Sequence, residues 1–120
     1  MVRILIIDDS RTSRKILRGV LESAGYEVIG EASNGEEGVQ KYLELKPDLV
    51  TMDVTMPTLD GLGALEKIMF TDPSAKVIMV TAAGQSKKAA QAIRLGAFEY
   101  LTKPFEAVQV IRVIEKCFRK

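Results

Sequence analysis

Three aspartates stand immediately after short apolar runs of the chain. Asp8 and Asp9 follow the run Ile4 to Ile7, and Asp53 follows the run Leu49 to Met52. Carboxylate oxygens suit hard divalent cations such as Mg²⁺, and an aspartate can also act as a nucleophile toward phosphorus. The pattern therefore indicates chemistry at a metal ion or a phosphoryl group, provided that the fold brings the three side chains together.

Two further polar residues occupy similar positions later in the chain. Thr81 follows the run Val77 to Val80, and Lys103 follows the run Phe98 to Thr102. Two carboxylates about 4 Å apart repel by roughly 4 kcal/mol at an effective dielectric constant of about 20. One lysine cannot balance three carboxylates, so we expect either a raised carboxylate pKa or a bound cation. With no histidine and one cysteine in the chain, oxygen ligands favour Mg²⁺, with Mn²⁺ as a substitute.

The hydrophobic pattern predicts the elements that must position these residues. We predict short strands over five runs: Ile4–Ile7, Glu27–Glu31, Leu49–Met52, Val77–Val80 and Phe98–Thr102. Helical spacing predicts a helix after each of these strands. The first helix has an apolar stripe and a left-handed end at Gly25, and the other four are predicted over the ranges given next. The stripe is Ile16, Leu17, Val20 and Leu21, and the later ranges are 35–45, 61–70, 87–95 and 107–118.

This alternation predicts an α/β fold with a doubly wound parallel sheet. Ligands of such sheets bind outside the carboxyl ends of the strands. We therefore expect Asp8, Asp9, Asp53, Thr81 and Lys103 to share one cleft.

Length and composition narrow the class of protein. The 120 residues fit one domain, expected over 1–120 with no output domain, and are 47% hydrophobic and 28% charged. Lys plus Arg (17) nearly balances Asp plus Glu (16), so we expect neither nucleic acid nor membrane as a partner. No export signal opens the chain, and we expect a cytoplasmic monomer. The single cysteine, Cys117, is predicted to have no chemical role.

Each site residue also has a purely structural interpretation. The Asp8-Asp9-Ser10 segment is typical of a helix N-cap, and Asp53 could lie in a turn before Met56-Pro57. Thr81 could satisfy a backbone group at a strand end, and Lys103 could be solvated. The coincidence of all of them at strand ends favours a functional site.

The motifs together resemble the receiver domain of response regulators. They are Asp8-Asp9, Asp53-Val54-Thr55-Met56-Pro57 with Asp60-Gly61, Val80-Thr81-Ala82 and Lys103-Pro104-Phe105. The resemblance spans essentially the whole chain and is closest to free-standing chemotaxis receivers, through residues 30–35 and 47–53. It implies a flavodoxin-like (βα)5 fold whose five parallel strands lie in the order 2-1-3-4-5.

The resemblance also implies a role for each site residue. Asp53 would accept a phosphoryl group from a phosphohistidine on a sensor histidine kinase. Asp9 would bind Mg²⁺ directly, Asp8 through water, and the backbone carbonyl of Thr55 would be a further ligand. Lys103 would pair with the phosphoryl group, and the peptide bond between Lys103 and Pro104 would be cis.

A switch and an output surface are implied in the same way. Thr81 would move toward the phosphoryl group and Tyr100 would turn inward, although Tyr100 could also simply cover the core at a sheet edge. Thr55 and Ala83, neither of them acidic or an amide, would tune the lifetime of the phosphorylated state. The surface that binds a flagellar motor component or a phosphatase would include Lys87, Lys88, Gln91, Tyr100, Glu106, Gln109 and Val110.

Three classes of function remain open at this stage. A phosphorylation-switched binding module, in chemotaxis or in another phosphorelay, is favoured, and it is not expected to be an enzyme with substrate turnover. An aspartate-nucleophile phosphatase of the haloacid-dehalogenase kind carries an Asp-x-Asp pattern, whereas Asp8 and Asp9 are adjacent. A flavodoxin-like nucleotide carrier needs a phosphate loop rich in Gly, Ser or Thr after the first strand, where this chain has the two aspartates.

Overall fold

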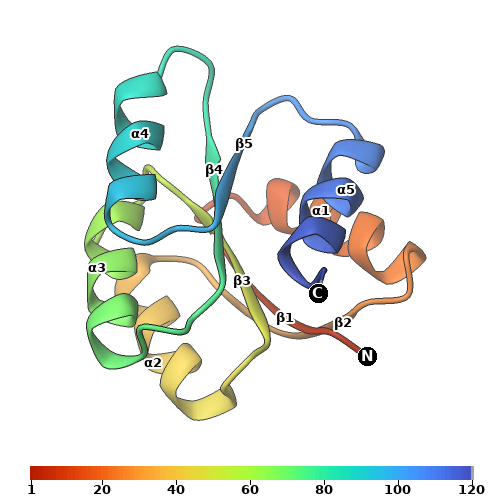
Figure 1. Ribbon diagram of the computed structural model, residues 1–120, viewed down its shortest axis with the longest axis horizontal. Helices are drawn as coiled ribbons and strands as arrows, with labels where there is room; N and C mark the ends of the chain where they lie inside the picture. Colours follow the sequence, from red (N-terminus) through yellow and green to blue (C-terminus); the bar gives the residue numbers. More distant parts are fainter. Residues whose placement is uncertain (120) are drawn as a thin grey trace.

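The structure is a computed structural model that describes residues 1–119, and it has ten elements in strict strand–helix alternation (Figure 1). The strands are β1 (Arg3–Ile7), β2 (Glu27–Ala32), β3 (Leu49–Asp53), β4 (Val77–Thr81) and β5 (Glu99–Thr102). The helices are α1 (Arg11–Ser23), α2 (Gly35–Leu45), α3 (Gly61–Thr71), α4 (Ser86–Arg94) and α5 (Ala107–Cys117). All the predicted elements are present, and their ends differ from the predicted ones by a few residues.

The five strands form one parallel sheet in the order β2-β1-β3-β4-β5, which confirms the predicted flavodoxin-like topology. Helices cover both faces of this sheet, with α2, α3 and α4 on one side and α1 and α5 on the other (Figure 1). Since every strand runs the same way, all five carboxyl ends lie along one rim of the sheet.

Two apolar cores flank the sheet, because side chains of a strand point alternately to its two faces. In β1, Leu5 and Ile7 pack toward α2, α3 and α4, while Ile4 and Ile6 pack toward α1 and α5. The central strands are buried on both faces, which is why their sequences are continuous apolar runs.

Local sequence explains where the helices begin and end. Ser10, Asn34 and Asp60 each accept a hydrogen bond from a backbone N–H of the first turn of α1, α2 and α3. Gly25, just after α1, has a φ of 90°, as the predicted left-handed end requires.

The predicted burial of one helix residue and the predicted exposure of another are wrong. Ile16, placed in the buried stripe of the first helix, is 58% exposed, and of that stripe Leu17 and Leu21 are buried. Val110, placed on the output surface, is 1% exposed and packs in the core between the sheet and the helices α1 and α5, whereas Val108 is 53% exposed. For Val110 the reason is helix phase, because two residues along a helix turn the side chain through about 200° and Val108 and Val110 therefore point to opposite faces.

No helix among residues 1–119 is both long enough and apolar enough to cross a membrane.

Candidate functional site

The three predicted aspartates meet at the rim formed by the carboxyl ends of the strands. Asp8 and Asp9 directly follow β1, and Asp53 is the last residue of the neighbouring strand β3. One carboxylate oxygen from each of the three lies within 4.8 Å of the other two. Asp8 is buried, Asp53 is partly buried and Asp9 is exposed, so the cluster opens to solvent on the Asp9 side.

Lys103 extends into this cluster from the loop after β5. Its ammonium nitrogen Nζ lies 3.2 Å from Asp8 Oδ2 and 3.7 Å from Asp53 Oδ2. The peptide bond between Lys103 and Pro104 is cis, as predicted, and the Lys103 N–H donates a hydrogen bond to the Thr81 carbonyl. The lysine is therefore tied to the end of β4 and balances only part of the negative charge.

The charge balance of the cluster is visible in the pKa of Asp53, which is raised to about 6. Burial is the main cause, and the Asp8 and Asp9 carboxylates add to it, while Lys103 and a backbone hydrogen bond from Thr55 act in the opposite direction. A cation bound between the three carboxylates would stabilise the ionised form of Asp53.

Asp8 is held from four sides. Its N–H donates to the Ala32 carbonyl of β2, Oδ1 accepts from the Ser10 N–H at 2.8 Å, Oδ2 accepts from Lys103, and its backbone carbonyl accepts from Arg14 at 2.6 Å. Ser10 is the N-cap of α1, since its hydroxyl accepts from the Ser13 N–H, which confirms the capping interpretation of this segment. Asp8 and Asp9 belong at the same time to the acidic cluster.

Thr81 and Tyr100, the predicted switch pair, lie on adjacent strands. Thr81 is buried and its hydroxyl donates to the Leu101 carbonyl at 3.4 Å, which is the strand-end role given above as its alternative. The Tyr100 side chain is 41% exposed at the edge of the sheet. The hydroxyl therefore points toward β5 in this conformation, and the ring lies outside.

The two residues predicted to tune lifetime lie in the loops that border the cluster. Thr55, in the loop after β3, and Ala83, in the loop after β4, are both exposed. Gln85 joins the two loops, because its Oε1 accepts from the Ala82 N–H and its Nε2 donates to Thr55 Oγ1, each at 3.1 Å. An amide group is thus present beside Thr55 although neither predicted position supplies one.

Beside the cluster is a cleft of about 440 Å³ lined by both polar and apolar side chains. Asp8, Ser13 and Lys103 form its polar part, and Ile16 and Phe105 belong to its apolar part. The exposed Ile16 therefore has a position next to the site.

Three residues of the site were not predicted from the sequence. Ser13 Oγ lies 3.5 Å from Lys103 Nζ, Arg14 contacts the Asp8 carbonyl, and Gln85 joins the two loops. Ser13 and Arg14 lie three and four residues after the N-cap Ser10, one helical turn from the cluster, and this spacing is the one sequence signal that points to them. Gln85 carries no such signal.

The donor set of the cluster fits a hard divalent cation. All three acidic side chains offer oxygen, one lysine leaves negative charge unbalanced, and the exposed Asp9 keeps the cluster accessible from solvent.

Sequence comparison gives the family. The profile of the "Response regulator receiver domain" matches residues 4–115, and the chain belongs to this family. Two curated relatives are both named "Chemotaxis protein CheY". The one from Thermotoga maritima is 47% identical over 95% of each chain, and the one from Listeria monocytogenes is 47% identical over 97% of this chain and 98% of its own.

Structural comparison agrees with this assignment. A CheY chain in the crystal structure of the CheX-CheY-BeF3-Mg²⁺ complex from Borrelia burgdorferi superposes with a TM-score of 0.95 and 36% identity. The match covers 99% of this chain and 90% of that one. The receiver domain of Thermotoga maritima CheB follows at a TM-score of 0.84 and 38% identity, over 98% and 93% of the two chains. The protein is therefore a receiver domain of the chemotaxis type, a signalling regulator and not a metabolic enzyme.

Proposed function

We propose that this receiver takes up a phosphoryl group on Asp53, in a Mg²⁺-dependent reaction, from the phosphohistidine of a sensor kinase. The observation that carries the proposal is the joint approach of Asp8, Asp9 and Lys103 to one partly buried aspartate. Phosphoryl transfer needs positioning and charge neutralisation more than covalent chemistry, and this cluster would supply both.

Asp53 would act as the nucleophile. One carboxylate oxygen would form a bond to phosphorus as the phosphorus–nitrogen bond of the phosphohistidine breaks, and the imidazole would retain that electron pair and take up a proton. Lys103, 3.7 Å from Asp53 Oδ2, would then pair with the new phosphoryl oxygens, and Thr81 would turn its hydroxyl toward them.

Asp8, Asp9, Asp53 and the Thr55 backbone carbonyl would hold the metal ion. When bound, Mg²⁺ or Mn²⁺ would neutralise the charge that the carboxylates and the transferring group bring together. Oxygen ligands on both flanking loops and one exposed carboxylate fit this role.

Release of the phosphoryl group would be governed by the side chains over Asp53. Thr55 and Ala83 are exposed in the loops after β3 and β4 and would border the approach of a water molecule, so they would set the lifetime of the phosphorylated state without preventing its formation. The receiver would thus assist its own phosphorylation and dephosphorylation while turning over no separate substrate.

The signal would leave through the exposed surface of α4, β5 and α5 to a protein partner, such as a flagellar motor component or a phosphatase. Lys87, Lys88, Gln91, Tyr100, Glu106 and Gln109 are all exposed there. The CheY relative in the Borrelia complex is bound to a protein, CheX, which supports a protein partner for a receiver of this shape.

The test is mass spectrometry after incubation with acetyl phosphate and Mg²⁺. The wild-type protein should gain one phosphoryl group, and Asp53→Asn should gain none because an amide is not a comparable nucleophile. A chelator should abolish the adduct on the wild-type protein.

Asp48→Asn is the matched control, because Asp48 is an exposed aspartate outside the cluster. It should be labelled like the wild-type protein. Equal labelling of Asp53→Asn, or labelling that is indifferent to chelator, would refute the proposed function.

A further inference from the structure

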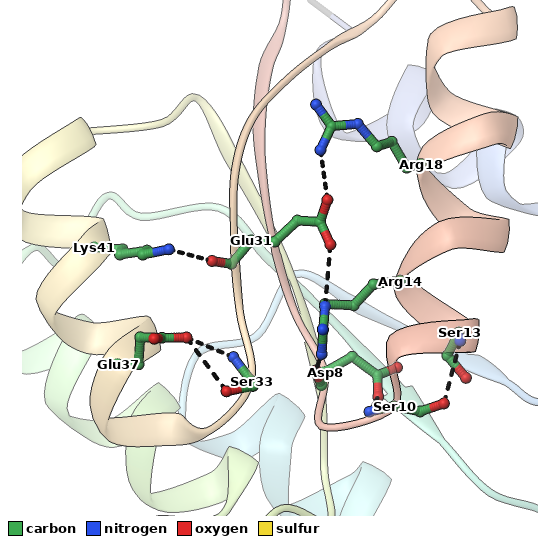
Figure 2. A network of polar contacts seen from close by, with 9 residues as sticks. All are labelled: Asp8, Ser10, Ser13, Arg14, Arg18, Glu31, Ser33, Glu37 and Lys41. Atoms are coloured by element: carbon green, nitrogen blue, oxygen red, sulfur yellow. Dashed lines mark hydrogen bonds and ion pairs between the residues drawn. The ribbon is translucent and has the colours of Figure 1, made fainter.

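A network of charged side chains joins α1 and β2 next to the acidic cluster (Figure 2). Glu31, on β2, accepts hydrogen bonds from Arg14 Nε at 3.0 Å and from Arg18 Nη1, both on α1. Arg14 is the more enclosed of the two arginines, with its side chain 16% exposed against 40% for Arg18. The backbone carbonyl of Glu31 is in turn bound by Lys41 from α2.

Arg14 differs from Arg18 in that its guanidinium makes a second hydrogen bond, to the backbone of the acidic cluster. Its Nη1 donates to the backbone carbonyl of Asp8 at 2.6 Å, so a single planar group bridges Glu31 and Asp8 (Figure 2). Arg18 contacts Glu31 and Glu22 instead. Of the two ion pairs made by Glu31, only the one with Arg14 therefore reaches the acidic cluster.

The carbonyl of Asp8 belongs to the peptide unit that joins Asp8 to Asp9. Because that unit is planar, fixing its oxygen also fixes the direction in which the chain enters Asp9. The Asp9 carboxylate is exposed, and no side-chain hydrogen bond to it is found among residues 1–119. Its aim toward Asp8 and Asp53 thus depends on the backbone.

We infer that Arg14, held by Glu31, is a positioning residue for the cation site, acting on the Asp8–Asp9 peptide unit and touching neither cation nor phosphoryl group. This inference rests on the proposed function, since it assumes that the cluster binds Mg²⁺. Groups behind metal ligands commonly set affinity by fixing the ligands' orientation.

Charge repulsion alone would change the affinity for Mg²⁺ in the opposite direction from the loss of positioning. Arg14 carries a positive charge close to a site for a cation, so removing that charge alone should strengthen Mg²⁺ binding. Removing the positioning contact should weaken it. The direction of the change therefore separates the two effects.

The experiment is calorimetric titration of Mg²⁺ into the wild-type protein, Arg14→Gln, Arg14→Lys and Arg18→Gln. Arg14→Gln should bind Mg²⁺ about tenfold more weakly. Arg14→Lys keeps the charge but lacks the planar fork that bridges two acceptors, so it should also bind more weakly. Arg18→Gln is the matched control: it removes an arginine from Glu31 without touching Asp8, and its affinity should stay within about twofold of wild type.

A second readout separates positioning from folding. In acetyl phosphate labelling, the Mg²⁺ concentration for half-maximal rate should rise for Arg14→Gln, while the rate at saturating Mg²⁺ stays near that of wild type. Urea unfolding in chelator gives the stability of each variant.

The outcomes are distinct. Unchanged or tighter Mg²⁺ binding by Arg14→Gln, or equal weakening in Arg18→Gln, would overturn the inference and leave the proposed function intact. Absence of Mg²⁺ binding by the wild-type protein would overturn both.

Discussion

Asp53 has a pKa of about 6, because it is partly buried and lies beside Asp8 and Asp9. This value is higher than the ordinary one near 3.8 expected in the unfolded chain. The folded protein therefore binds the Asp53 proton more tightly than the unfolded chain does. The contribution of this proton to stability is complete below about pH 4 and is lost as the pH rises through about 6.

Replacing Asp53 by Asn should therefore stabilise the metal-free protein at pH 7.5. We expect a gain of about 1–2 kcal/mol in the free energy of unfolding, less than the full value of the shift because solvent screens a site that is open on one side. Urea unfolding in chelator at pH 4 and pH 7.5 measures this gain, which should be small at pH 4.

Added Mg²⁺ should reverse the order of stability in this experiment. It should stabilise the wild-type protein, since a ligand that binds only the folded state shifts the equilibrium toward it. Asp53→Asn lacks one of the three carboxylates and should gain less. A wild-type protein more stable than the variant in chelator at pH 7.5 would contradict the assigned environment of Asp53.

Thr51 gives a second prediction at the scale of single residues. It is 2% exposed in β3, and its hydroxyl is the one fully buried side-chain polar atom within residues 1–119 that has no hydrogen-bond partner. Valine has the same shape without the hydroxyl, so Thr51→Val should raise the free energy of unfolding by about 1 kcal/mol. The same exchange at Thr81, whose hydroxyl does have a partner, should not be stabilising. Loss of stability in Thr51→Val would indicate that the hydroxyl is satisfied in solution.

At the scale of elements, the two loops over Asp53 are tied together by one side chain. The Gln85 side chain is hydrogen-bonded to both the Ala82 N–H and the Thr55 hydroxyl. Ala82 directly follows Thr81, so these hydrogen bonds also restrain the end of β4. If the chain just after β4 shifts when the Thr81 hydroxyl turns toward a phosphoryl group, this link would resist the shift.

Gln85→Ala should therefore speed phosphorylation by acetyl phosphate. One hydrogen bond contributes on the order of 1 kcal/mol, which corresponds to about a fivefold change in rate if it is lost before the transition state. Gln91→Ala is the control, because Gln91 is an exposed glutamine of α4 and is not among the residues that contact the cluster. Labelling of Gln85→Ala no faster than wild type would show that the link is already open during the reaction.

The elements themselves could be predicted because apolar runs and helix caps are local signals. Val77–Thr81 is buried throughout, and a run of that kind has few other stable environments. The positions of the rim residues followed from strand ends alone, because Asp8, Asp53, Thr81 and Lys103 lie at or just after the ends of β1, β3, β4 and β5. The role of each residue there stays a prediction. Side-chain contacts between elements, such as Arg14 with Asp8, depend on helix phase and rotamers, and the misplacement of Val110 has the same origin.

At the scale of the whole molecule, the site and the proposed output surface are joined through β4 and β5. Thr81 lies at the rim, its hydroxyl bonds to the Leu101 carbonyl, and Tyr100 is the residue before Leu101. Movement of the Thr81 hydroxyl toward a phosphoryl group would break this hydrogen bond and free space beside the edge strand. A local change can in this way bias a distant side chain between two packings.

Beryllofluoride with Mg²⁺ should accordingly bury the Tyr100 ring, which is 41% exposed here. Tyrosine-labelled NMR with a soluble relaxation agent would follow the accessibility of the three tyrosine rings. Only the Tyr100 signal should become protected, and Thr81→Ala should reduce its response. An equally accessible Tyr100 ring in both states would remove this residue from the switch.

Lys103 meets Asp8 across 95 positions of sequence, through a sheet in which β5 is an edge strand. During synthesis on the ribosome, the acidic residues of β1 and β3 emerge long before their lysine. An incomplete chain thus carries the aspartates without the geometry that would make one of them reactive. The receiver should become able to receive a signal only when β5 joins the sheet. A partly synthesised or partly degraded chain should therefore be unable to receive one.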